Sequence, residues 1–361
     1  MTESIYTVFN TSDRPLSAID ADAPPIIKAL RIGITAPNAH NTQPWTIDIR
    51  SDTEASLYFD PARSLPFTDP LGRQVHISHG TLLEMTAIAA TSLGYRAEFD
   101  ILPEGEMSFA EFGTKPTAHI RLIPAPDIEA DPLFGRILHR RTSRRNHEGP
   151  RVTEAEFRKI IEQSKREGVD AGMIAEDRFT EALEIIKQAI AIEVNDRPLY
   201  EESLVWFRFS KREIAEKGDG ISLFTMSGLT GLMLHLARLT VRPRTFHAAL
   251  NRKSFLKTFN QATASTRGLL TLVTPTNTMS DWINTGRVYV RAQLAADALG
   301  LRFQPVSQSL QEFPEMDKLR AKMNALVGVT TPAKLQMLVR VGRSQPPALS
   351  PRRELGRIIR R

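Results

Sequence analysis

The sequence predicts an α+β protein in which two related halves form a pseudo-dimer within one chain. Short runs of alternating apolar and polar residues, typical of strands, are separated by longer runs with helical periodicity. A glycine-framed helical segment also occurs twice, from Gly80 to Gly94 and from Gly286 to Gly300. The chain of 361 residues is too long for one small core and long enough for two units of ordinary size.

The two glycine-framed segments agree in length and in part of their sequence. Ala89-Ala90 of the first matches Ala295-Ala296 of the second, and Leu93 matches Leu299. Because alanine and leucine are common residues, a chance alignment is the alternative. Each copy is followed by an extended segment, and this shared continuation favours a true repeat. We therefore expect two halves that are related as the subunits of a two-fold dimer are.

Local patterns place the elements of each half. In the first half we expect an amphipathic run at residues 26–34, a polar loop at 36–45 and a strand hairpin at 46–50 and 55–60. A helix at 75–93, ended by Gly94, and a strand at 117–123 are predicted to follow. In the second half, Thr153 and Glu156 form a capping box that opens a helix. Further helices are expected at 179–194 and 286–299, and strands at 268–273 and 335–341.

These patterns divide the chain into an N-terminal arm at residues 1–25, a first half at 26–130 and a second half at 131–361. The helix-rich stretch at about 201–266 is predicted to be a lid-like insertion, with a packing or dimerisation surface as an equally weighted alternative. Within it, residues 221–241 approach the length of a membrane span, but polar residues and two glycines interrupt the apolar run. We expect a buried or lid helix there and no membrane association.

Composition limits the function classes. The chain is 41% apolar and 24% charged, which is typical of a soluble globular protein. It contains no cysteine, which excludes disulfides, thiolate metal ligands and a cysteine nucleophile. The first residues show no basic segment followed by an apolar core, so no secretory signal is expected. We expect a cytoplasmic protein.

The net charge of +6 is concentrated in two arginine clusters, at residues 136–151 and 340–361. Such clusters bind nucleic acid in some proteins and a phosphate-bearing cofactor in others, since the guanidinium group is a rigid fork for phosphate oxygens. No zinc finger and no aromatic RNA-binding pattern accompanies them, and only 7% of the residues are aromatic. The cofactor interpretation is therefore favoured, and no nucleic-acid partner is expected.

The loop at residues 36–45, APNAHNTQPW, is the most distinctive stretch of the chain. Prolines near both ends and amide side chains between them predict a rigid polar turn. Its amide and main-chain groups cannot all bond locally, so it suits a polar, planar ligand. A capped turn without ligand is the alternative.

A second candidate is the basic run at residues 139–145, HRRTSRR, which precedes the capped helix. Guanidinium groups interleaved with hydroxyls are suited to hold and orient a phosphate. A solvated basic face is the alternative. The histidines give little support for a metal site, because His76 and His79 share a helix without a carboxylate partner, although His40 lies in the polar loop. No serine-protease order or nucleophile elbow is present.

Four motifs together resemble the FMN-dependent nitroreductase superfamily, in its Acg-like branch. APNAHNTQPW resembles the family's APSxxNxQPW loop, and RRTSR resembles its RRSxR opening motif, with Asn146 where the family usually has an aromatic residue. The segment from Trp282 to Leu301 resembles its W…G…AA…LGL helix, and SPRR at 350–353 resembles its closing basic motif. The resemblance spans about residues 26–350.

This resemblance implies a nitroreductase-like fold with one FMN between the halves. The first half has the loop without the opening motif, and the second half has the opening motif without the loop, so the parts suffice for one site. The resemblance assigns the cofactor-binding residues to four segments: Arg140, Arg141, Thr142 and Arg144; Pro37, Asn38, Ala39 and Asn41; Pro305, Ser307 and Gln308; Arg352 and Arg353.

The resemblance also implies an activity. NADPH or NADH would reduce the flavin, a nitroaromatic or quinone-type acceptor would reoxidise it, and no protein side chain would act as a catalytic acid or base. The alternative is a flavin-sequestering or storage protein whose closed lid prevents turnover. The expected partner is a small-molecule acceptor, with the chain acting as a monomer or a homodimer.

Overall fold

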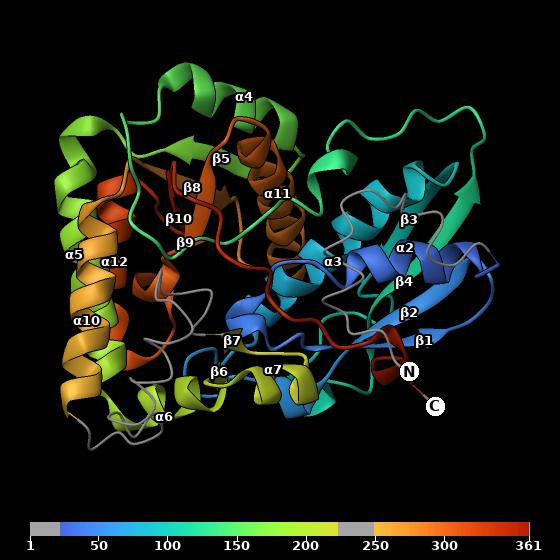
Figure 1. Cartoon of the computed structure of the whole chain (residues 1–361), viewed down its shortest axis with the longest axis horizontal. Helices are drawn as coiled ribbons and strands as arrows, with labels where there is room; N and C mark the ends of the chain where they lie inside the picture. Colours follow the sequence, from blue (N-terminus) through green and yellow to red (C-terminus); the bar gives the residue numbers. More distant parts are fainter. Residues whose placement is uncertain (1–21, 223–248, 361) are drawn as a thin grey trace.

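The structure is a computed structural model that describes residues 22–222 and 249–360. The predicted N-terminal arm falls outside these residues except for its last four positions, and so does most of the apolar run at 221–241. No helix in the described part is long and apolar enough to cross a membrane. Figure 1 shows the two four-stranded sheets separated by a pair of central helices.

The first half contains one antiparallel sheet with a helix at its start and another in its middle. In chain order its elements are α2 (Pro25–Gly33), β1 (Trp45–Ile49), β2 (Glu54–Phe59), α3 (Arg73–Thr91), β3 (Tyr95–Ile101) and β4 (Pro116–Pro124). The strand order in space is β1-β2-β4-β3. The predicted hairpin is confirmed, since Trp45 lies opposite Phe59 and Ile49 lies opposite Ala55.

The second half repeats this succession. Its corresponding elements are α4 (Glu154–Ser164), β5 (Asp170–Met173), β8 (Gly268–Thr274), α11 (Met279–Ala298), β9 (Arg302–Pro305) and β10 (Lys334–Gly342). The strand order is β5-β8-β10-β9, again antiparallel throughout. In both sheets the fourth strand of the chain lies between the second and the third. This identity of order confirms the prediction of an α+β chain with two related halves.

The two halves meet where α3 packs against α11, between the sheets (Figure 1). A Cβ atom at Gly80 would lie 1.8 Å from the carbonyl oxygen of Ile283, and one at Gly286 would lie 1.9 Å from that of Ile77. The first glycine of each repeated segment is thus required by the close approach of the two helices. One hydrophobic core extends across this contact, so the halves are packed as one unit.

The helix starts follow from local capping. Thr153 accepts a hydrogen bond from Glu156 N, and the Glu156 carboxylate returns to Thr153 N, as the capping box predicts. α11 begins at Met279 and not at the predicted Gly286, because Thr278 and Asp281 form a second capping box. At the other end, Gly94 and Gly300 follow the two central helices with φ of 77° and 71°, values that favour glycine.

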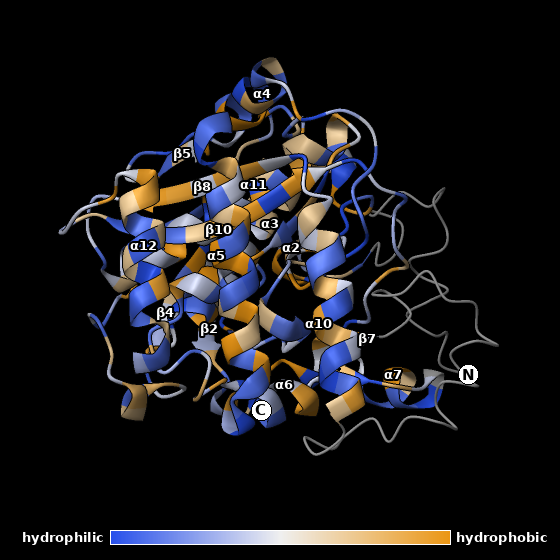
Figure 2. Cartoon of the chain, turned by 90° about the vertical axis from the view of Figure 1, so that its left-hand side faces the viewer, coloured by the Kyte–Doolittle hydropathy of each residue, from blue (hydrophilic) through white to orange (hydrophobic). Residues whose placement is uncertain are grey.

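A long insertion separates β5 from β8. It comprises α5 (Glu176–Asn195), α6 (Arg197–Val205), β6 (Phe207–Arg208), α7 (Lys211–Lys217), β7 (Ile221–Ser222) and α10 (Ala249–Ala264). After β9, helix α12 (Asp317–Val327), which was not predicted, packs on α5. Figure 2 views this side and shows polar and apolar residues alternating around α5 and α10, as expected for helices with one face on the protein.

The C-terminal tail crosses back to the first half. Ile47 N in β1 donates to Ile358 O, and Arg360 N donates to Ile47 O. The tail thereby extends the edge of the first sheet, and it carries residues 350–353 past the loop at 36–45 on its way.

Candidate functional site

The loop at residues 36–45 has an unusual backbone. His40, Asn41 and Gln43 have φ of 47°, 53° and 52°, in the left-handed region that residues other than glycine rarely adopt. Each such residue costs about 1 kcal/mol or more, so three within four positions persist only when surrounding contacts hold them. Strain of this kind is concentrated at functional sites.

Helix α3 supplies several of the contacts that hold the loop. Thr81 Oγ1 donates to Pro37 O at 2.6 Å, and His79 Nε2 lies 2.9 Å from Pro44 O. Ser78 Oγ accepts from Ala39 N at 3.2 Å. His79 is fully buried and also contacts Thr117 Oγ1, so it has a structural role in the core. The backbone from Pro37 to Ala39 is thereby fixed against the central helix.

Asn41 ties the loop to two distant segments. Its amide nitrogen donates to Gly220 O in the insertion and to Pro351 O in the tail, each at 3.0 Å. Its amide oxygen accepts from Arg352 at 2.9 Å. The side chain predicted to approach a flavin is therefore engaged with protein, and it positions Arg352 beside the loop.

The basic run is aligned by β9. Ser143 N donates to Phe303 O at 3.0 Å, and Thr142 forms a parallel bridge with Phe303, so residues 142–144 continue the second sheet. Thr142 Oγ1 accepts from Gln293 Nε2 of α11 at 3.2 Å. The segments that the sequence separates by more than 150 residues are thus brought together at the end of one strand.

Four arginines surround a small hollow of about 70 Å³ between the loop, the basic run and the tail. They are Arg140, Arg141, Arg144 and Arg352, and Asn41 also lines the hollow. None of the four forms a salt bridge with a described residue; the carboxylate of Asp297, which acts on Arg140 and Arg141, is itself paired with Arg302 at 2.6 Å.

Burial governs the charge of these groups. It lowers the pKa of Arg140 and Arg144, lowers that of Arg141 to about 10, and, with the charges of Arg140 and Arg141, lowers that of Arg352 to about 9. Arg352 donates to the carbonyl oxygens of residues 34–36, which satisfies its hydrogens without neutralising its charge. All four groups remain cationic at neutral pH, and the hollow therefore attracts an anion.

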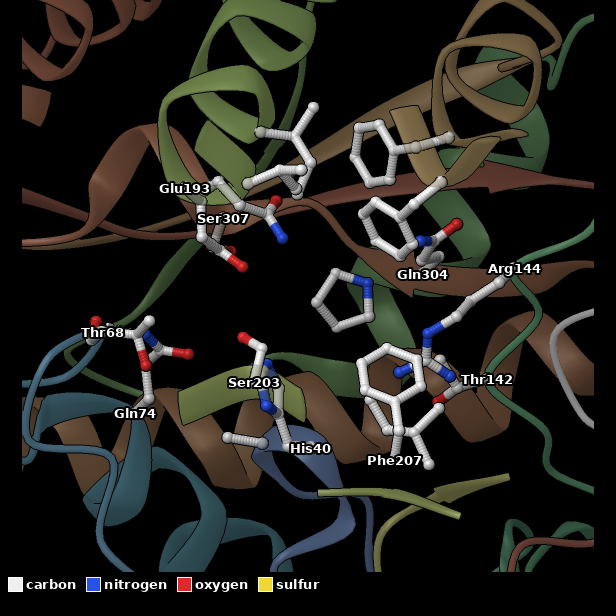
Figure 3. A pocket seen from close by; sticks show the side chains of 18 of the residues that line it. His40, Thr68, Gln74, Thr142, Arg144, Glu193, Ser203, Phe207, Gln304 and Ser307 are labelled. Atoms are coloured by element: carbon white, nitrogen blue, oxygen red, sulfur yellow. Dashed lines mark hydrogen bonds between the residues drawn. The ribbon is translucent and has the colours of Figure 1, made fainter. Parts of the chain in front are cut away.

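A large cavity of about 690 Å³ adjoins the hollow. The two share Pro37, Asn38, Thr142, Arg144 and Ile221 as lining residues. Figure 3 shows Arg144 and Thr142 at one side of this cavity, beside Gln304 at the end of β9. The arginine hollow, called the arginine chamber below, thus adjoins a space large enough for a cofactor or a drug-sized molecule.

Both halves and the insertion contribute to the cavity wall. The first half provides residues 37–40 and the start of α3, and the second half provides Gln304, Pro305, Ser307 and Gln308. Phe207, Phe209, Phe255 and Phe259 of the insertion line it as well. The segment predicted as a lid therefore covers part of the cavity with aromatic side chains.

Several polar atoms around the two spaces have no hydrogen-bond partner within the described residues. These are His40 Nδ1, Arg140 Nε, Arg141 Nε and Gln308 Oε1, all of them buried. Buried polar atoms are normally paired, so this group suits a ligand that offers both donors and acceptors. His40 is neutral at pH 7, because burial and the charge of Arg144 lower its pKa to about 4.

The structure gathers all but one of the sequence-predicted residues at the two spaces. Arg353 lines neither; its guanidinium donates to Gln43 O and Trp45 O, each at 3.0 Å, and supports the loop from behind. The sequence reasoning missed Tyr289 and Gln304, which line the cavity, and Gln293, which contacts the basic run. The i, i+4 spacing of Tyr289 and Gln293 on the repeated helix was the available signal.

No family model matches the chain, but curated relatives do. The chain is 26% identical over 351 residues to "Putative NAD(P)H nitroreductase Rv3131" of Mycobacterium tuberculosis strain H37Rv, covering 94% of this chain and 92% of the relative. It is 24% identical over 345 residues to "Putative NAD(P)H nitroreductase acg" of the same organism, covering 92% and 95%. These relatives confirm the resemblance to the Acg-like branch of the nitroreductase superfamily along nearly the whole chain.

Among solved structures, the chain matches the FMN and NADPH-dependent nitroreductase NfnB from Sphigopyxis sp. strain HMH. The TM-score is 0.40 at 16% identity, over 63% of this chain and 97% of that one.

Proposed function

We propose that the chain is an FMN-dependent NAD(P)H oxidoreductase of the nitroreductase type, with one FMN held between its two halves and a nitroaromatic or quinone-type acceptor as substrate. The observation that carries the proposal is the junction of a large cavity with a side chamber of four arginines that lack a carboxylate partner among the described residues.

The arginine chamber fits the phosphate of FMN. A phosphate monoester carries a charge near −2 at neutral pH and three acceptor oxygens, and charge-assisted bonds from guanidinium groups are among the strong hydrogen bonds in proteins. The unpartnered Nε atoms of Arg140 and Arg141 are donors that such a phosphate would use. Without an anion, several cationic groups would remain buried close together, an arrangement that costs free energy.

The cavity fits the flavin ring. A planar ring needs two flat walls and a few polar groups at its edge. Residues 37–39 line the cavity from the first half, and Pro305, Ser307 and Gln308 line it from the second, while Thr142, Gln304 and Gln308 supply polar groups. The strained loop and the end of β9 would thus hold the ring from opposite halves.

When bound, FMN would supply the redox chemistry between NAD(P)H and the acceptor. The chain binds the phosphate, orients the ring between its two halves and excludes water with the phenylalanines of the insertion. We propose that residues 201–266 act as a lid in this sense, inside a second half that extends over 131–361, and that the lid selects acceptors by size.

An anaerobic absorption experiment tests the proposal. The purified protein, supplied with FMN, should show the bands of a bound oxidised flavin, and NADPH or NADH should bleach them. The double variant Arg140→Ala/Arg144→Ala should remain folded and colourless. The matched control Arg96→Ala/Arg121→Ala removes two exposed guanidiniums from the first sheet and should keep full flavin occupancy.

Two other results would contradict parts of the proposal. Full flavin occupancy in the Arg140→Ala/Arg144→Ala variant would contradict the assignment of the phosphate chamber. A bound flavin that dithionite reduces but neither NADPH nor NADH reduces would contradict the enzyme and support a flavin-storage protein with a closed lid.

A further inference from the structure

We propose that Glu193 is the proton donor to a quinone-type acceptor, and that the part of the cavity around it is the acceptor subsite. This inference rests on the proposed function and extends it, because the sequence-based expectation assigned no acid to the protein. Among the described residues that line the cavity, Glu193 is the single carboxyl group.

Glu193 occupies the side of the cavity that faces away from the arginines. It lies in the last turns of α5, and Figure 3 shows it across the cavity from Arg144 and Thr142, beside Ser307. A flavin with its phosphate in the arginine chamber leaves this opposite side for the second reactant. The carboxyl group therefore lies at the end of the cavity away from the arginines, beside Ser307 of the proposed ring site, where an acceptor would be held.

The surroundings of Glu193 favour the protonated form of its carboxyl group. The side chain is 6% exposed and lies near Ile190 and Val194 of its own helix, which line the cavity as well. Its one hydrogen bond among the described residues comes from Gln311 Nε2 to Oε2 at 3.0 Å. Burial raises the pKa of Glu193 to about 7, against a smaller opposing effect of the Gln311 bond.

Charged residues near Glu193 either raise its pKa further or act on other groups. From α6, the carboxylate of Glu202 raises the pKa of Glu193 further, while it accepts hydrogen bonds from Thr68. Tyr200 of α6 also lines the cavity, and the charge of Arg252 of α10 acts on it. The remaining titratable residues of the lining, His40, Arg144 and Tyr289, belong to the loop, the basic run and α11.

A quinone needs two electrons and two protons to become a hydroquinone. A hydride, which NAD(P)H would supply through a bound flavin, would bring both electrons and one proton. The Glu193 O–H bond breaks and a new O–H bond forms on a quinone oxygen, which provides the second proton. The resulting carboxylate recovers a proton from water before the next turnover.

The test separates the two half-reactions in stopped-flow experiments on the FMN-loaded protein. In Glu193→Gln, which keeps the shape and the acceptor oxygen for Gln311, reduction of the flavin by NADPH should be unchanged. Reoxidation by a benzoquinone should slow by about 100-fold, the scale of general acid catalysis. Reoxidation by ferricyanide, which takes electrons without protons, should not slow. The control Glu184→Gln changes an exposed carboxylate on the same helix and should behave as wild type.

The pH dependence adds a second readout. The carboxyl group is protonated below its pKa of about 7, so quinone reoxidation in the wild type should fall as pH rises through this value. The same rate should be flat across this range in Glu193→Gln. An infrared difference spectrum without any acceptor should show a protonated-carboxyl band that disappears near pH 7 and is missing in Glu193→Gln.

Equal quinone rates and equal pH profiles in the wild type and Glu193→Gln would overturn the inference while leaving the proposed function intact. The lack of a titrating carboxyl band would overturn it as well. Failure of the proposed function is distinguishable, because it would appear as missing flavin bands or as no reduction by either nicotinamide. The infrared measurement needs no flavin, so it decides the protonation of Glu193 even in that case.

Discussion

Two arginine clusters in this molecule differ in whether a carboxylate of the protein is paired with them. Around Glu84, which is 1% exposed, Arg166, Arg287 and Arg291 converge with distances of 2.8 to 3.0 Å to its carboxylate oxygens. Around the small hollow, four arginines converge with no carboxylate paired to them among the described residues. The protein itself neutralises the first cluster, whereas we propose that the second binds an anion.

The two clusters lie at positions that the internal repeat relates to each other. Counted from Gly80 and Gly286, Arg287 of α11 occupies the position that Thr81 has in α3, and Thr81 lines the cavity. Arg166 lies between α4 and β5, the connection that corresponds to the strained loop between α2 and β1. We infer that the chain keeps a ligand site at one of two related positions and fills the other with its own ion pairs.

The connection between the first two strands of each sheet also differs between the halves, and the longer connection lies beside the proposed ligand site. In the first half it spans residues 50–53, and in the second half it spans residues 174–267. The long connection wraps toward the arginine chamber and the cavity, as the lining residues from α5 to α10 indicate. The asymmetry of the pseudo-dimer is thus concentrated in the parts that surround one site.

The largest effect is expected when the paired cluster loses its carboxylate. Glu84→Gln leaves three guanidiniums without their shared partner, and breaking a buried ion pair in this way costs about 3–5 kcal/mol. Burial opposes the ionised form of Glu84, but the arginines outweigh this effect and lower its pKa. The contribution of Glu84 to the free energy of unfolding is therefore present above the unfolded-state pKa and is lost as the pH falls through the lower folded-state pKa. Urea denaturation at pH 7 measures the loss. The exposed pair variant Glu54→Gln should cost less than 1 kcal/mol.

The contact between the halves can be tested at two equivalent positions. Gly80→Ala and Gly286→Ala each place a methyl group within 2 Å of a backbone oxygen on the other central helix, and overpacking of this kind costs about 1–3 kcal/mol or more. Both variants should lose similar stability in urea denaturation, and Gly135→Ala, where nothing lies nearby, should not. A loss at one of the two positions alone would show that the helices do not share the contact equally.

Sequence reasoning recovered the elements whose signals are local. The hairpin, the central helices and the capping box at Thr153 depend on neighbouring residues. The same holds for the loop at 36–45 and the basic run at 139–145, whose residues line the two spaces. It missed β5, whose four residues Asp170–Met173 include a glycine and do not alternate clearly, and it placed the start of α11 seven residues late. The unused signal was the capping pattern at Thr278.

The site residues that were missed depend on contacts between distant segments. Glu193 is in a helix that was predicted correctly, but a glutamate in an amphipathic helix normally faces solvent, and its burial follows from α6 and the segment near Gln311. The hydrogen bonds of Asn41 to Gly220 and Arg352 could not be predicted, because no pattern in the loop reveals that these residues meet it. Such pairings become visible in the fold alone.

A comparison of two ligands sharpens the contrast between the clusters. If the arginine chamber needs a phosphate, FMN should stabilise the protein more than riboflavin, which has the same ring without the phosphate. Charge-assisted hydrogen bonds contribute about 1.5–3 kcal/mol each, so FMN should bind at least about tenfold more tightly. Thermal unfolding with each ligand and calorimetric titration measure the difference. Equal affinities would mean that the arginines do not bind the phosphate.

The smallest effect tests the charge of the hollow without any ligand. Arg144 has no hydrogen bond or salt bridge to another described residue, and burial lowers its pKa, so the folded protein holds it at a cost. Arg144→Gln should therefore leave the flavin-free protein as stable as the wild type or more stable by about 1 kcal/mol, the opposite of Glu84→Gln. The same substitution should reduce the preference for FMN over riboflavin. A loss of stability in flavin-free Arg144→Gln would show that the protein already neutralises this cluster, and the contrast between the two clusters would then disappear.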